Sequence, residues 1–514
     1  MKHPVKFCSI QSGSAMRKAI IFIAVLALAS GLARTQAQDT RSTIAQSLTP
    51  PALGLPRVNQ SLIEFPLPRG EAAYAAIDGR KMHKYVIELA DISKRYRDAG
   101  HPKFWGRIIG TSSDKETEEW LAAKFRALGL SDVRIQHLDL PPQWMPQSWS
   151  VTMTGGGKTI ALESAQPDYY ANGLPPGGVD LDAVYAGLGT EADFAGRDVR
   201  GKAVFVYTML GAPEVGAVKR AEAKGAAVVL EVSMLPGNMR YQAYPSGTQA
   251  PAFTLGNDDG MAARRMLETG PAKVKVSLDV QKVPDLQTAL VWGTLPGATD
   301  ETIYIVAHKD GWFEGASDNG GGVASMLGLA EYYAKIPNAK RKRTLVFIGL
   351  DGHHNGPDGG VGRRWMVANK ATLFAKTALF MNVEHPATIA MQSRPRYYPG
   401  DELAWANTTM PLQWYAGGKS RPELQQITWD AFRRFGVPVE FDPSPAPPAG
   451  DAGAFFRFLP AVSASEYHSY FHTDWETPEV VPWTGLEAST RAFAKIIDEV
   501  NKHPLSDFQR PEEK

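Results

Sequence analysis

The feature that most constrains the fold is an apolar run that ends in potential metal ligands. Residues 302–307 (TIYIVA) are followed directly by His308, then by Asp310, and Asp318 comes ten residues after the histidine. Such a run is typical of a buried β-strand, and the side chains after it would lie at the strand's carboxyl end. The segment therefore predicts an α/β protein with a ligand site at one edge of its sheet.

Three further apolar runs are followed by side chains of the same kind. In chain order they are residues 344–350, 377–383 and 460–465. His353 and His354 follow the first run, Glu384 follows the second, and His472 lies shortly after the third. Imidazole and carboxylate groups suit zinc, so we expect the strand ends to hold one or two zinc ions.

Two acidic residues have distinct expected roles in this site. The carboxylate of Asp318 has two oxygens and can bridge two metals. Asp310 is a natural acceptor for the second ring N–H of His308, although a solvated loop acid is the alternative. The glycines at 320–322 resemble a phosphate-binding turn, but no phosphate-loop lysine follows, and close packing of a helix is the better explanation.

The motifs of this chain, taken in order, resemble those of a known family. They are His308-x-Asp310, Gly315-Ala316-Ser317-Asp318-Asn319, Leu350-Asp351-Gly352-His353-His354, Asn382-Val383-Glu384 and His472-Thr473-x-x-Glu476-Thr477. The set is similar to the co-catalytic zinc exopeptidases, which include bacterial leucyl aminopeptidases, glutamate carboxypeptidase and the transferrin-receptor relatives. The resemblance implies a mixed, mostly parallel sheet flanked by helices, and a hydrolase of peptide or aminoacyl substrates, with aminopeptidase activity as the first expectation.

The same resemblance implies a set of metal ligands. His308 and Glu384 would hold one zinc ion, His354 and His472 would hold the other, and Asp318 would bridge them.

For the last ligand, His468 is also eligible. The family places an acid four residues after this ligand and a threonine five after. Glu476 and Thr477 meet that spacing for His472, which we therefore favour. Asp451 resembles a supporting aspartate, with a surface acid as the alternative.

The chain departs from the family at His353 and His354, where two glutamates are usual. The first glutamate position is the general base, and an imidazole with an unperturbed pKa near 6.5 can take that role. The second is a metal ligand, which a histidine replaces easily.

The change also removes negative charge. Two zinc ions bring four positive charges, which Asp318 and Glu384 would only half balance, so a single-zinc state becomes more plausible. Two alternative functions follow: a non-catalytic binding relative, and single-zinc amide chemistry similar to that of glutaminyl cyclases.

The chain divides into segments of different character. We predict a signal peptide (1–37), a linker (38–80), an N-terminal peptidase part (81–174), an insert (175–284), a C-terminal peptidase part (285–505) and a tail (506–514). Within the insert, residues 202–232 read as strand, helix and strand, and the segment resembles a β-rich protease-associated domain. Upstream, we expect one helix through Tyr85 and Ile92, and a second that opens with a capping box of Ser113 and Glu116.

The amino terminus reads as an export signal. A short basic region at residues 16–18 (MRK) precedes the apolar run 19–28, and small residues allow cleavage after Ala33 or Ala37. We therefore expect an exported protein that is free of the membrane after cleavage, with an uncleaved anchor as the alternative. The single cysteine, Cys8, falls in or before this signal, and the net charge of +1 argues against a nucleic-acid partner. The oligomeric state is left open.

Overall fold

The structure is a computed structural model that describes part of the chain. The described residues are 66–208, 215–235, 237–355, 359–394, 402–407, 412–416, 421–437, 439–441, 450–465 and 470–509, and they all belong to one unit, Arg57–Lys514. The predicted signal peptide with Cys8, most of the linker, His468 and the end of the tail lie outside these residues. No helix within the described ranges is long and apolar enough to cross a bilayer.

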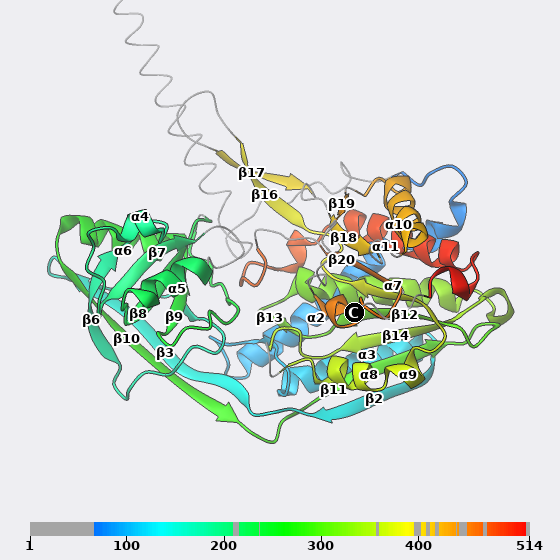
Figure 1. Ribbon diagram of the computed structural model, residues 1–514, viewed down its shortest axis with the longest axis horizontal. Coiled ribbons are helices and arrows are strands. Elements are labelled where there is room, and N and C mark those ends of the chain that lie inside the picture. Colours follow the sequence, from blue (N-terminus) through cyan, green and yellow to red (C-terminus); the bar gives the residue numbers. More distant parts are fainter. Residues whose placement is uncertain are drawn as a thin grey trace, which may run out of the picture. The chain divides into compact units, whose positions relative to one another are not determined.

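The predicted ligands lie at the ends of strands, or next to them, in an eight-stranded sheet (Figure 1), which we call the ligand sheet. Its order is β19 (Val439–Phe441), β18 (Leu412–Ala416), β20 (Ala461–Ser465), β15 (Thr377–Val383), β12 (Thr302–His308), β14 (Thr344–Leu350), β11 (Gln287–Leu295) and β2 (Ser131–Asp139). The four central strands from β20 to β14 run parallel, while β11, β2 and β18 pair antiparallel. The mixed, mostly parallel sheet predicted from the sequence is therefore confirmed.

Helices and loops cover both faces of the ligand sheet. On one face, Phe125 of α3 (Ser112–Ala127) contacts Phe347 of β14, and α7 (Gly322–Ala334) packs along β12. On the other face, Tyr304 and Val306 of β12 share a core with Met366 of α8 (Val361–Ala368). Because side chains alternate along a strand, the continuous apolar runs are explained by burial on both faces.

The remaining helices pack around this frame. They are α2 (Gly79–Asp98) and α11 (Trp483–Val500), which contact each other and α7; α10 (Pro422–Arg434), which contacts α11 and β18; and α9 (Lys370–Leu373), which follows α8. A short pair, β1 (Gly106–Arg107) with β13 (Gly311–Trp312), and the hairpin β16 (Ile389–Arg394) with β17 (Glu402–Asn407) lie outside the large sheets.

The start of α3 differs from the prediction. The helix begins at Ser112, Thr111 precedes it without a side-chain cap, and the expected capping box of Ser113 and Glu116 is absent. The Ser113 hydroxyl instead accepts a hydrogen bond from Ile108, and Glu116 is bonded to Arg95 of α2. The preceding turn therefore engages Ser113, and a neighbouring helix engages Glu116, so neither side chain caps α3.

A second eight-stranded sheet is formed by residues 143–283, which we call the lobe. Its order is β4 (Lys158–Ala161), β3 (Gln143–Gly155), β10 (Ala272–Val283), β6 (Val179–Tyr185), β7 (Ala203–Thr208), β8 (Val228–Ser233), β9 (Ala252–Leu255) and β5 (Gln166–Pro167). The predicted strand, helix and strand are β7, α5 (Val215–Ala223) and β8, while α4 (Glu191–Phe194) and α6 (Asn257–Thr269) are additional.

The lobe is inserted between β2 and β11. The chain enters through residues 140–142 and returns through residues 284–286, where Leu140 donates its N–H to the Leu286 carbonyl at 2.9 Å. The strand pairing places β3, β4 and β5 in the same sheet as β6 to β10. The domain boundaries at 174 and 284, and the likeness of the insert to a protease-associated domain, stay predictions.

Candidate metal centre

The carboxyl ends of the parallel strands bring the predicted ligands together. His308 is the last residue of β12, His354 follows β14, Glu384 follows β15, and His472 lies in the turn after β20. All four are buried, with exposed fractions of 0–3%. Asp318, exposed by 1%, reaches them from η4 (Ala316–Gly321), an irregular helical turn before α7.

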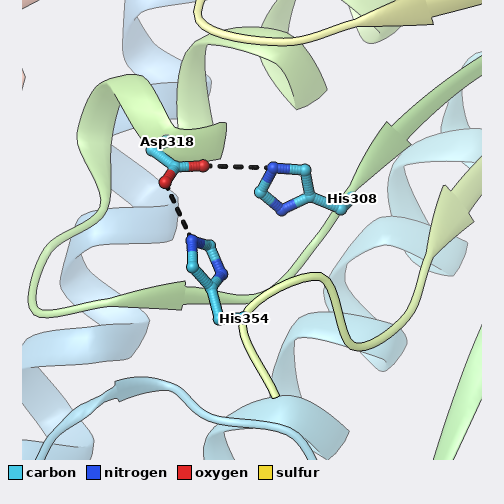
Figure 2. A group of neighbouring side chains, drawn as sticks. All are labelled: His308, Asp318 and His354. Carbon is cyan, nitrogen blue, oxygen red and sulfur yellow. Dashed lines mark hydrogen bonds and ion pairs between the residues drawn. The ribbon is translucent and has the colours of Figure 1, made fainter. Parts of the chain in front are cut away.

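Asp318 is the centre of this group. Figure 2 shows its carboxylate between His308 and His354, each of which faces a different oxygen. His308 Nε2 is 3.1 Å from Asp318 Oδ1, and His354 Nε2 is 2.8 Å from Oδ2. His472 Nε2 also lies 2.9 Å from Oδ2. One carboxylate thus has imidazole nitrogens at both of its oxygens, as a carboxylate that bridges two metals requires.

The polar atoms in this group fit a metal better than they fit one another. Within the described residues, Asp318 Oδ1, His308 Nε2 and His472 Nε2 make no hydrogen bond of normal geometry, although they are buried and in close contact. Ligand atoms around a tetrahedral zinc with bonds of 2.0–2.1 Å would lie about 3.3 Å apart, close to these contacts. His308, Asp318 and His354 offer three ligand atoms within 4.8 Å of one another.

Asp310 orients two of the histidines from behind. Its Oδ1 is 3.2 Å from His308 Nδ1, and its Oδ2 is 3.0 Å from His354 Nδ1. Because an ionised carboxylate only accepts hydrogen bonds, both rings would carry their proton on Nδ1 and present a lone pair at Nε2.

The charges in the group stabilise one another. Burial alone would raise the pKa of Asp318 and of Asp310, but the facing imidazoles hold both well below the usual range. Burial would lower the pKa of His354, yet Asp318 and Asp310 raise it to about 9. For His472 the effect of burial is larger than that of Asp318, and burial lowers its pKa to about 3. A metal ion that replaced protons on these imidazoles would therefore be close to ionised carboxylates, those of Asp318 and Asp310.

His353 lies beside the group and faces different partners. Its Nδ1 is 3.3 Å from Asp451 Oδ1, and its Nε2 is 3.1 Å from the hydroxyl of Tyr244, which belongs to the lobe. Asp451 also pairs with Arg363, and this guanidinium and His353 offset the effect of burial and hold the pKa of Asp451 at about 2. Since Asp451 is ionised and can only accept, the Nδ1 of His353 carries the proton and Nε2 is the basic atom.

Two residues in this region did not figure in the sequence prediction. Tyr244 reaches the site from the lobe and packs edge-on against His472, with ring centroids 4.8 Å apart. His385, the neighbour of Glu384, has its Nε2 2.8 Å from Asp318 Oδ1. The signal for His385 was present in the sequence, since it is one of the few histidines at a predicted strand end. Nothing local indicated Tyr244, because its contact joins segments 109 residues apart.

Two buried side chains hold the backbone of the ligand-bearing turns in place. Arg107 of β1 is fully buried and donates hydrogen bonds to the carbonyls of Lys309, Glu314 and Gly315. Glu476, four residues after His472, accepts from the backbone N–H of His472 at 3.0 Å and from that of Asp318. Both residues therefore position the turns that carry the ligands.

Comparison with known proteins connects this region with a peptidase family. Residues 291–497, which include every predicted ligand, match the sequence model of peptidase family M28. Aminopeptidase YwaD of Bacillus subtilis is 25% identical over 253 residues, which are 47% of this chain and 50% of that protein. The probable glutamate carboxypeptidase VP8 of Zea mays is 24% identical over 349 residues, 54% of this chain and 48% of that protein. The chain thus spans about half the length of these curated relatives.

Solved structures share the fold over more of the chain. BSAP, a zinc aminopeptidase from Bacillus subtilis, superposes with a TM-score of 0.56 at 17% identity, covering 88% of this chain and 100% of that one. A peptidase M28 precursor from Shewanella amazonensis gives a TM-score of 0.61 at 17% identity, with 85% and 100% covered. At this identity the likeness concerns the fold.

Proposed function

Because residues 291–497 belong to peptidase family M28, we propose that this protein is a zinc-dependent exopeptidase that acts as an aminopeptidase. The observation that carries the proposal is the buried Asp318 carboxylate with imidazole nitrogens at both oxygens. The names of the related aminopeptidases support the same activity. Peptides and aminoacyl compounds with a free amino terminus are the proposed substrates.

His308, His354, His472 and Asp318 are the residues best placed to hold zinc. Their buried atoms without hydrogen bonds fit a cation that prefers nitrogen and carboxylate ligands. When bound, zinc polarises the scissile carbonyl and lowers the pKa of a coordinated water to about 7. Since both oxygens of Asp318 have imidazole neighbours, we propose that these residues would hold two ions.

His353 is the proposed general base. Its Nε2 accepts a proton from the attacking water and then delivers it to the leaving amine. Asp451 holds the ring by its Nδ1–H and stabilises the cationic form that carries the transferred proton. The hydroxyl of Tyr244 donates to Nε2 when no substrate is present, so it has to release this atom before proton transfer.

The histidines at positions 353 and 354 also favour a second candidate function. In the family that the sequence resembles, two glutamates are usual here, and the loss of a carboxylate base would suit a non-catalytic binding relative. Single-zinc amide chemistry, similar to that of glutaminyl cyclases, would also suit a site with fewer acids. Both alternatives predict no release of amino-terminal residues from peptides.

A substrate panel separates these functions. The purified protein is assayed with aminoacyl p-nitroanilides, the same compounds with a blocked amino group, and peptides with amino-terminal glutamine. The proposal predicts hydrolysis of free aminoacyl compounds that stops with a chelator and returns with zinc. Release of blocked residues alone, cyclisation of glutamine, or inactivity with every compound at full zinc loading would contradict it.

Export is part of the proposal. It is supported by the basic and apolar pattern of residues 16–28. Mass spectrometry of the protein from its natural host should find an amino terminus near Arg34 or Gln38. An intact chain from Met1 in the cytoplasm would contradict it.

A further inference from the structure

We propose that His385, and not Glu384, is the metal ligand at the end of β15, so that four histidines surround the bridging Asp318. This inference rests on the proposed zinc-dependent function. It changes the composition of the metal site and gives Glu384 a different role.

The contacts of Asp318 carry the inference. Its Oδ2 faces His354 and His472 at 2.8 and 2.9 Å, and its Oδ1 faces His308 and His385 at 3.1 and 2.8 Å. Each oxygen thus has two imidazole Nε2 atoms next to it. His385 is 4% exposed and is therefore as enclosed as the other three histidines.

Glu384 is held away from this arrangement by the opposite loop. Its Oε1 accepts the backbone N–H of Asp451 at 3.2 Å. A Cβ atom on Gly450 would lie 2.0 Å from Glu384 Oε2, so the carboxylate fills the space that this glycine leaves. Its nearest site histidine by ion-pair distance is His353, with Oε1 3.9 Å from Nδ1. Glu384 therefore contributes charge next to the proposed base.

A competing arrangement would keep Glu384 as a ligand. His308, His353 and Glu384 offer three ligand atoms within 4.8 Å of one another. That arrangement needs a free nitrogen on His353, but Nδ1 faces Asp451 at 3.3 Å and Nε2 faces the Tyr244 hydroxyl at 3.1 Å. It also leaves Asp318, the carboxylate between the other histidines, outside the group. The four-histidine arrangement disturbs neither contact.

The backbone gives an independent indication. His385 and His472 have φ angles of 39° and 59°, in the left-handed region that residues other than glycine rarely adopt. Strain of this kind persists where the surrounding structure requires it, and it concentrates at ligand sites. In both residues it accompanies a side chain turned toward an oxygen of Asp318.

In this arrangement most of the negative charge that balances two zinc ions lies outside the ligands themselves. Four neutral imidazoles and one carboxylate leave most of the charge of two zinc ions unbalanced in the first layer. Asp310, Glu384 and Asp451 form an outer layer of acids that touch the site histidines or their neighbours. A site rich in nitrogen ligands favours zinc, cobalt or nickel over magnesium and manganese.

Two neighbouring variants test the assignment: His385→Ala and Glu384→Gln, a matched control from the same turn. Each is dialysed against buffered zinc, and zinc per chain is measured by mass spectrometry. We expect two zinc ions in the parent and in Glu384→Gln, and one in His385→Ala. Added imidazole should restore the second zinc to His385→Ala, because the small molecule can enter the space left by the side chain.

Cobalt-loaded parent protein gives a count that needs no variant. Each histidine bound through Nε2 keeps an exchangeable ring N–H, whose proton resonance the paramagnetic ion shifts far downfield. Four such resonances are expected with His385 as a ligand. Two are expected in His385→Ala, because loss of the metal ion next to Asp318 Oδ1 also removes the shifted signal of His308. Three in the parent, or loss of zinc in Glu384→Gln with retention in His385→Ala, would overturn the assignment while leaving a zinc peptidase intact. A parent that binds no divalent metal would overturn both proposals.

Discussion

Asp318 in η4, beside the ligand sheet, and Asp168 in the lobe are both buried carboxyl groups, with exposed fractions of 1% and 0%. Their neighbours differ in kind. Imidazoles face Asp318 and hold its pKa well below the usual range. Asp168 lies near Glu231, and neither makes a hydrogen bond of normal geometry to the described residues. Burial raises the pKa of Asp168 to about 8 and that of Glu231 well above its usual value.

The comparison shows that burial alone does not define a metal site. A carboxylate surrounded by imidazoles stays ionised and can hold a cation between itself and the nitrogens. Burial raises the pKa of two carboxyl groups that face no cation, because charge in a low-dielectric interior is costly. The carboxylate among imidazoles is suited to metal binding. The pair of carboxyl groups in the lobe is suited to an uncharged, packed interior.

The strongest test of this difference replaces each aspartate by asparagine. Asp318→Asn removes the charge between the histidines, so we expect loss of bound zinc and a fall of peptidase activity to the background rate. Asp168→Asn, the matched control in the lobe, should keep both. Zinc content and hydrolysis are measured on the same preparations. Equal zinc in the two variants would remove the distinction between the regions.

The next largest effect is expected at His353. In His353→Ala the fold and the zinc should remain, while the rate of hydrolysis falls by about 10²–10⁴-fold, the usual contribution of a positioned general base. Loss of zinc together with activity would instead identify His353 as a ligand. Unchanged activity would exclude it from the mechanism. His353→Glu restores the carboxylate usual in the related family and should recover part of the rate.

A smaller effect is expected where an acid acts through a histidine. Asp451→Asn keeps the shape of the side chain but removes the charge at the Nδ1 of His353. Groups that orient a catalytic or ligating histidine in this way usually contribute about 10–100-fold. We expect that loss in kcat, with zinc content and KM little changed. A fall in zinc content equal to that of Asp318→Asn would show that Asp451 supports the metal and not the base.

The smallest effect separates the two regions by pH. The pKa of Asp168 is raised to about 8 in the folded lobe, against about 3.9 in an unfolded chain. The protonated group therefore favours the fold fully at pH values below about 4, and this contribution is lost as pH rises toward 8. Asp168→Asn does not titrate, so its unfolding temperature relative to the parent should rise from pH 5 to pH 8 and then level off. The exposed Asp180→Asn is the control, and a difference that is constant with pH would contradict the charge state assigned to the lobe.

The sequence predicted the parts of the site that depend on local pattern. The apolar runs before His308, His353 and Glu384 are strands because each is buried on both faces, and the polar residue after each run must then lie at the sheet edge. The choice between Glu384 and His385 is different in kind. It depends on the turn after β15 and on the contact of Glu384 with Gly450, which comes from another loop. The residues next to Glu384 in the sequence do not reveal its contact with Gly450.

The same limit explains the other differences. Tyr244 reaches His353 only because the lobe folds back between β2 and β11, a contact that no local pattern encodes. The predicted capping box is absent because Ser113 is bonded to the backbone of Ile108 and Glu116 to Arg95 on a neighbouring helix. Strand positions follow from periodicity, whereas the partners of a buried polar group follow from the assembled fold.

The most direct test of the account is a zinc titration of the metal-free protein, with hydrolysis of an aminoacyl p-nitroanilide followed at each addition. We expect no hydrolysis without metal, a rise with added zinc, and a plateau at two zinc ions per chain. Hydrolysis by the metal-free protein, or none at any zinc loading, would contradict the claim that this buried cluster is the catalytic metal centre.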